Sequence, residues 1–262
     1  MEVDEWLLGA VIAFAIATVT TPAGVSGAVF LLPVQISVLD VPNPALTPTN
    51  LLYNVVSTPG ALVRFLRERR LAGPLTRALL IGTVPGIVVG AVLRVEVLDG
   101  PRVFLVVVAL VLAPLGAWML SGRGERTADR SPPAPGPAVT ACAFGAGLVG
   151  GVYGIGGGSL LGPALVVMGY SLYAIAPAAL ATTFVTSLAG VATYQVLQLA
   201  HGEAAIAPEW GLGLAMGAGG LAGSYLGARL QRRIPEAGLR RLLGAICVAL
   251  AARYVLQGLG AG

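Results

Sequence analysis

The residues with the clearest chemical potential form a glycine-rich run, GGVYGIGGGSLLGP, at Gly150–Pro163. Four of the five residues from Gly154 to Gly158 are glycine, and Ser159 follows them. Glycine lets the backbone approach a ligand closely, and a helix that begins after such a turn points free N–H groups at an anion. The run therefore predicts an anion site; the alternative is that its glycines serve only tight packing and hairpin turns. A Walker-type nucleotide loop is excluded, because it needs a lysine and the chain has none.

A weaker copy of the run, TTPAGVSG, occupies positions 20–27. Its Gly24 and Gly27 match Gly154 and Gly157 at a constant offset of 130 residues. Two glycine-rich breaks at corresponding places in apolar segments indicate a site between two repeats. The residues that we predict to contact the substrate at the two breaks are Gly24, Ser26, Gly27, Gly154, Gly156, Gly157, Gly158 and Ser159.

Polar side chains recur at helical spacing on the apolar segment that follows each break. Inside a membrane, such side chains usually face the interior of the helix bundle. Interhelical hydrogen bonds, worth about 0.6 kcal/mol each, would explain the threonines and serines equally well. For the two asparagines we favour a place on the permeation path. The predicted residues are Asn50, Asn54 and Ser57 in the first half and Thr182, Thr183 and Ser187 in the second.

Groups for covalent, acid–base or metal chemistry are scarce. The single histidine, His201, falls in a predicted outer loop, and all twelve Asp and Glu residues lie in termini, in loops or at the edges of apolar segments. An intramembrane enzyme needs a nucleophile with a base, or a metal cluster. We therefore expect no enzyme activity, no catalytic residue, no metal site and no cofactor. Hydroxyls, amides and helix ends without a buried acid suit a small anion better than a cation.

The composition indicates the elements that hold these residues. Of 262 residues, 56% are hydrophobic and 11% are charged, whereas soluble domains carry about 25% charged residues. Apolar stretches long enough to cross a bilayer recur along the chain. This predicts an all-α polytopic membrane protein. The net charge of +4 comes from arginines in short loops, which act as topology signals rather than as a nucleic-acid surface.

Each half of the chain holds four apolar blocks, and the first of them is too long for one crossing. As a single helix, residues 6–39 would run about 50 Å, against a hydrocarbon core of about 30 Å. If all eight blocks cross, nine arginines lie on one side and seven on the other. If the two broken blocks are re-entrant hairpins, thirteen lie on one side and only Arg94, Arg102 and Arg253 on the other.

The second arrangement is the one we expect. Each repeat then has a broken, re-entrant helical hairpin plus three transmembrane helices, and the odd number of crossings makes the two repeats inverted. The first transmembrane repeat spans 1–121, a Pro-rich linker 122–137, and the second repeat 138–262. The arginine-rich side is the cytoplasm. We therefore expect a multi-pass protein of the plasma (inner) membrane, with the linker cytoplasmic and both termini outside.

Two longer motifs carry a resemblance that covers nearly the whole chain. They are GVYGIGGGSLLGPALVVMG followed by ALATTFVTSLAGVATY, and a weaker copy, GVSGAVFLLPVQISVLD with ALTPTNLLYNVVSTPG. Both resemble the sulfite exporter TauE/SafE family, also called the toluene sulfonate uptake permeases. In the weaker copy, Ser26 and Ala28 replace two glycines of the family pattern. The positions that match the family motif are Gly154, Gly156, Gly157, Gly158 and Thr182–Thr183.

Such a resemblance implies a secondary transporter or facilitator for small sulfur-containing anions, such as sulfite, sulfonates or sulfoacetate. Its partners would be a small anionic substrate and the lipid bilayer, with no nucleic acid and with self-association left open. Two alternatives stay open as well. One is an uncoupled, channel-like permease for another small anion, and the other is a membrane subunit of a larger complex.

Overall fold

The computed structural model describes residues 3–69, 71, 73–97, 134–202 and 206–231, with shorter pieces between 109 and 121 and between 233 and 256. Every element in these ranges is helical. The linker at 122–137 lies largely outside the described residues, and so does about half of each of the apolar blocks that end the two halves, at 103–120 and 239–256. The elements are α1 (Val3–Thr20), η1 (Thr21–Ala23), α2 (Ala28–Ser37), α3 (Asn43–Arg67), α4 (Pro74–Glu96), α6 (Pro137–Tyr153), η3 (Gly157–Leu160), α7 (Leu161–Val167), α8 (Leu172–His201) and α9 (Trp210–Leu230).

The outside of the helix bundle is apolar, and polar side chains gather inside it. Leu199 is 81% exposed, and Leu7 and Val196 are each 65% exposed. In contrast, serines, threonines and asparagines of α3 and α8 are fully buried. In the described part of the chain, three segments are long and apolar enough to cross a membrane: Asp4–Ala23, Pro74–Glu96 and Tyr173–His201. This distribution is that of a polytopic membrane protein, whose solvent is lipid.

The helices are interrupted at the two runs where the sequence predicts breaks. After α1 and η1, Gly24 takes the left-handed conformation (φ 76°, ψ 17°), and after α6, Gly154 takes nearly the same one (φ 70°, ψ 16°). A side chain at Gly24 would lie 2.6 Å from the backbone of Ala176 near the start of α8, and one at Gly154 would meet the backbone of Thr47 near the start of α3. Glycine is therefore required at each turn for two reasons: its dihedral angles are left-handed, and a larger side chain would not fit. Each break packs against the long helix of the other half.

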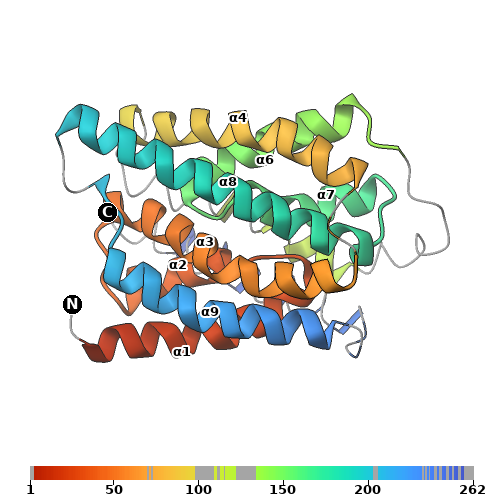
Figure 1. The fold of residues 1–262 in the computed structure, drawn as a ribbon, viewed down its shortest axis with the longest axis horizontal. Coiled ribbons are helices and arrows are strands. Elements are labelled where there is room, and N and C mark those ends of the chain that lie inside the picture. The colour runs from red at the N-terminus through yellow and green to blue at the C-terminus, as the bar shows by residue number, and fades with distance from the viewer. Residues whose placement is uncertain are drawn as a thin grey trace.

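Two ladders of glycines bring helices of different halves into backbone contact. Gly82, Gly86 and Gly90 of α4 lie against the backbone of α6. The ladder in α9 formed by Gly219, Gly223 and Gly227 lies against the backbone of α1. In both pairs the contacts advance together along the two helices, so α4 runs parallel to α6, and α9 runs parallel to α1 (Figure 1). Small residues at every fourth position allow this close approach in lipid.

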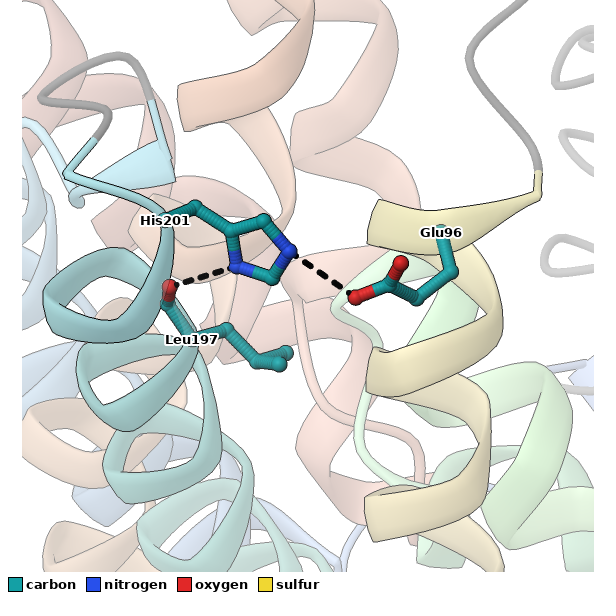
Figure 2. A network of polar contacts seen from close by, with 3 residues as sticks. All are labelled: Glu96, Leu197 and His201. Atoms are coloured by element: carbon teal, nitrogen blue, oxygen red, sulfur yellow. Dashed lines mark hydrogen bonds and ion pairs between the residues drawn. The ribbon is translucent and has the colours of Figure 1, made fainter.

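The contacts between helix ends define two ends of the bundle, which we call end A and end B. At end A the N–H of Glu209, just before α9, donates to Thr49 Oγ1 near the start of α3, at 2.8 Å. The last residues of α4 and α8 also meet at end A, as Figure 2 shows. It follows that α1, α3 and α9 begin at end A, and that α4, α6 and α8 begin at end B (Figure 1). Each broken segment thus returns the chain to the end at which it entered.

The sequence predicts His201 in an outer loop, but His201 is the last residue of α8. Its Nε2 lies 3.0 Å from Glu96 Oε1, and its Nδ1 lies 2.9 Å from the carbonyl oxygen of Leu197 (Figure 2). The two paired side chains are 37% and 47% exposed. An ion pair in such a wet position contributes about 0–1 kcal/mol. The pair joins two helix ends outside the packed interior.

Candidate substrate-binding site

Six residues from both halves of the chain meet inside the bundle, and we call them the central polar cluster. Their side chains come from the two breaks and from the middle of α3 and α8. All of them are buried, with at most 3% of any polar side chain exposed. The members are Ser26, Asn54, Gly156, Ser159, Thr183 and Ser187.

The two breaks touch through a pair of serines. The backbone N–H of Ser26 donates to Ser159 Oγ at 3.2 Å, and the Ser159 hydroxyl donates to Ser26 Oγ at 2.9 Å. Ser159 Oγ also lies 3.4 Å from Thr183 Oγ1 of α8. Since the Ser26 oxygen accepts from Ser159, its own hydrogen stays available for a third group. The serine pair therefore links the halves and still offers one donor.

Gly156 forms the floor of the cluster. Its dihedral angles (φ 68°, ψ 134°) belong to a region that is essentially restricted to glycine. A Cβ atom placed there would lie 2.6 Å from Thr183 Cγ2, 3.0 Å from Ser187 Oγ and 3.4 Å from Asn54 Nδ2. The missing side chain thus lets polar groups of α3 and α8 face the backbone of the second break.

Two residues beside Gly156 each have a buried polar atom with no hydrogen-bond partner among the described residues. The atoms are Asn54 Oδ1 and Ser187 Oγ, and both residues are 0% exposed. The amide nitrogen of Asn54 donates to the carbonyl oxygen of Gly154 only at 3.4 Å, which is long for a hydrogen bond. Leaving a buried polar group unsatisfied costs about 1–3 kcal/mol. Two such groups at one glycine are explained when a bound molecule completes their hydrogen bonds.

Backbone N–H groups of the second break add further donors. The N–H of Gly157 donates to Thr186 Oγ1 at 3.3 Å, and the N–H of Ser159 donates to the carbonyl oxygen of Gly156 at 3.3 Å. The N–H of Gly158 lies ahead of the first hydrogen bond of η3, so helix geometry gives it no intrahelical partner. The helix that follows, α7, has only seven residues. Its dipole is therefore short, and side chains supply most of the cluster's polarity.

A protein-family model, Sulfite exporter TauE/SafE, matches residues 9–254, which include both breaks and all six members of the cluster. The chain belongs to the sulfite exporter TauE/SafE family. Members of this family are membrane transporters and not enzymes. No curated protein and no solved structure matches the chain. The described part of this TauE/SafE protein also holds no group of three or more His, Cys, Asp or Glu side chains that could bind a metal ion.

Several residues that the sequence predicts for the site have partners elsewhere in this TauE/SafE protein. Asn50 accepts from Gln35 Nε2 at 3.0 Å and donates to the carbonyl oxygen of Ala28 at 3.0 Å, so it fastens α2 to α3. The carbonyl oxygen of Ser57 accepts from Ser224 of α9 at 2.6 Å. These two residues of the predicted stripe therefore hold helices together.

The other predicted residues divide between packing and the cluster. Gly24 lies against Ala176, and a side chain at Gly27 would collide with the hydroxyl of Tyr53. Thr182 is fully buried and its hydroxyl has no partner among the described residues. It directly precedes Thr183 in α8, so the two side chains point to different sides of the helix. Gly154, Gly157 and Gly158 belong to the same break as Gly156 and Ser159.

Three further polar residues near the site are outside the predicted set. Thr47 donates to the carbonyl oxygen of Val152 at 3.1 Å, and Thr186 accepts from Gly157. Gln35 is fully buried and holds Asn50. Thr47 precedes Asn50 by three residues on the same helical face, and Gln35 is a lone amide in an apolar helix. Both patterns were visible in the sequence.

Proposed function

We propose that this protein carries small sulfur-containing anions, such as sulfite, sulfonates or sulfoacetate, across the plasma membrane, and that the central polar cluster binds the anion near the middle of the bilayer. The observation that carries the proposal is that Asn54 and Ser187, which both face Gly156, are fully buried and each have one polar atom, Asn54 Oδ1 and Ser187 Oγ, without a partner among the described residues. Asn54 and Ser187 come from the middle of the two long helices α3 and α8. Irregular backbone at that depth is tolerated when it lines a site.

The chemistry of the cluster suits an anion. Sulfite and sulfonates present three oxygens, all of them hydrogen-bond acceptors. The hydroxyls of Ser26 and Ser187 can each donate one hydrogen, and Asn54 Nδ2, the atom of its amide nearest Gly156, carries a second N–H besides the one directed at Gly154. Hydrogen bonds to an ionised acceptor are about twice as strong as neutral ones. No carboxylate belongs to the cluster, so it has no negative charge that would attract a cation or repel an anion.

We further propose that the two halves are inverted copies that rock around the cluster. Three observations support this. Gly24 and Gly154 have nearly equal dihedral angles. The pattern of buried positions in α1, from Gly9 to Thr20, recurs in α6 at the same offset of 130. In addition, α1 begins at end A and α6 at end B. Rocking of two such halves would open the cluster to each side of the membrane in turn.

The proposed orientation places end B in the cytoplasm. Arg64, Arg67, Arg77 and Arg229 lie at end B, because α3 and α9 end there and α4 begins there. Short loops rich in arginine stay on the cytoplasmic side. Single cysteines at Ala128, in the linker, and at Ala204, after α8, test this in a background with Cys142 and Cys247 replaced by serine. An impermeant thiol reagent should label Ala204→Cys in intact cells and Ala128→Cys only after permeabilisation. The reverse pattern would contradict the orientation.

The function itself is tested by flux in proteoliposomes. Uptake of sulfite, thiosulfate, sulfoacetate and taurine is compared with uptake of sulfate and chloride. We expect saturable uptake of at least one sulfur compound, and a decrease of roughly tenfold to hundredfold in Ser187→Ala, which loses about one hydrogen bond to a charged ligand. The matched control is Gly145→Ala, because a side chain at Gly145 meets no atom within 4 Å.

The same assay separates the alternatives. Unsaturable flux of chloride alongside the sulfur anions would indicate a channel-like permease. No flux of any anion through folded protein would falsify the transport proposal and would favour a role as a membrane subunit of a larger complex. Wild-type flux in Ser187→Ala would leave transport intact but would remove Ser187 from the site.

A further inference from the structure

A buried cation lies between the central polar cluster and end A. Arg94, in the last turn of α4, is only 6% exposed. It is the one charged residue among the buried residues of the described chain. A guanidinium is costly to bury, and ionisable residues enclosed within membrane proteins commonly mark substrate pathways.

The surroundings of Arg94 are the end of α6 and the face of α8 that carries Ser187. One turn earlier in α4, Gly90 lies against the backbone of Leu148 and Gly151. Arg94 lies one turn further along α4 than Gly90 and is therefore level with the last residues of α6. Tyr153 is the last residue of α6, immediately before the second break.

The position of Arg94 relative to the cluster follows from Tyr194 of α8, which contacts the end of α6. It follows Ser187 by seven residues, or about two turns, on the same face of α8 and toward end A. Its hydroxyl donates to the carbonyl oxygen of Gly151 at 2.8 Å. Arg94 therefore lies on the end A side of the cluster, near the C-terminal, negative end of the α6 dipole. Without a cation there, that end would repel an approaching anion.

The other half of the chain has a neutral residue at the corresponding place. Gln231 follows Gly227 by four residues, as Arg94 follows Gly90. Gln231 Nε2 donates to the carbonyl oxygen of Pro22, in the first break, at 2.7 Å. A neutral amide is thus sufficient to bind a backbone carbonyl at this position. A charged side chain is therefore not needed at position 94 for such a structural role.

We propose that Arg94 forms a second anion-binding position on the end A side of the cluster, and that it makes the affinity for the anion higher from end A than from end B. This inference rests on the proposed function, because the ligand is the same small sulfur oxyanion or sulfonate. A guanidinium can bind two oxygens of such a group at once. At end B, Gln231 offers hydrogen bonds but no charge, so the two entrances differ.

The test compares the two sides of the membrane. Uptake of sulfoacetate is measured in right-side-out and inside-out vesicles, whose exposed ends are assigned by the cysteine labelling above. Arg94→Gln should raise KM about tenfold from end A, the size of one lost charged hydrogen bond, and by less than about twofold from end B. Arg94→Lys should give a KM between those of wild type and Arg94→Gln, because it keeps the charge but loses the paired N–H groups that bind two oxygens. Gln231→Arg, with Arg94 intact, should lower KM from end B.

The controls keep the inference falsifiable. An unchanged KM from both ends in folded Arg94→Gln would overturn it and leave Arg94 as a cap of α6. If Arg94→Gln does not fold, Gln231→Arg decides, and an unchanged KM from end B overturns the inference. If the wild-type protein shows no flux at all, the proposed function fails. The inference is then judged by sulfoacetate binding to purified protein, measured as a thermal shift, and an equal shift in wild type and Arg94→Gln, or none in either, overturns it.

Discussion

Replacement of Gly156 by alanine is expected to lower sulfoacetate flux by roughly tenfold to hundredfold. The backbone at Gly156 has a positive φ that strains any other residue by about 1–3 kcal/mol, and every 1.36 kcal/mol corresponds to a factor of ten. The new methyl group would also come 2.6 Å from Thr183 Cγ2 and 3.0 Å from Ser187 Oγ, inside the cluster. The measurement is initial uptake into proteoliposomes, normalised to folded protein.

A second substitution separates the steric part of this effect from the backbone part. Thr183→Ser removes the methyl group that the alanine would strike and keeps the hydroxyl that faces Ser159. The double variant Gly156→Ala with Thr183→Ser should therefore recover part of the flux, with the backbone strain remaining. Full flux in Gly156→Ala alone would show that the substrate does not pass this glycine.

Asn54→Asp is expected to abolish sulfonate flux at neutral pH and to restore part of it in acid. An ionised carboxylate at this fully buried position would face the anion directly, and like charges at close range repel strongly in a low dielectric. Protonation removes that charge, and burial raises the pKa of a carboxyl group that has no cationic partner. Flux should therefore rise as the pH falls, relative to wild type. A sulfonate is the right substrate, because it stays ionised throughout.

The matched variant is Asn54→Leu, which has a similar size and no charge. It should lose flux to the same extent at every pH, because it lacks hydrogen bonds and cannot be restored by protons. Equal pH profiles of Asn54→Asp and Asn54→Leu would contradict a direct contact between residue 54 and the anion. Thermal stability of both variants in detergent shows that each is folded at the pH of the assay.

Local features of the fold could be predicted from the sequence because proline and glycine interrupt helices wherever they cluster. The runs at 20–27 and 150–163 stand out in apolar segments, and the helices end there. The family was also recognisable from the second run, and the match over 9–254 confirms it. Helical spacing correctly placed Asn54 on a buried face, since the 3.6-residue period is a property of the helix alone.

The sequence could not tell which buried polar residue faces the site and which joins two helices. Asn50 and Asn54 are one turn apart on one face, yet Asn50 is held by Gln35 and Ala28 because α2 folds back over it. The sequence predicts Arg94 in a loop, because it lies at the end of an apolar block. Only the packing of α4 along α6 reveals that its side chain is enclosed. These distinctions depend on contacts between distant segments.

The glycine ladders have a consequence for how the chain assembles. Among the described helices, α1 makes its extensive contacts with α9, and α6 makes its own with α4. The first helix of each half therefore packs mainly against a helix of the other half: α1 against α9, and α6 against α4. We therefore expect that neither half packs fully on its own, because the main packing partner of α1 is α9 in the other half. We expect α1 to reach its final packing only after α9 has been synthesised and inserted.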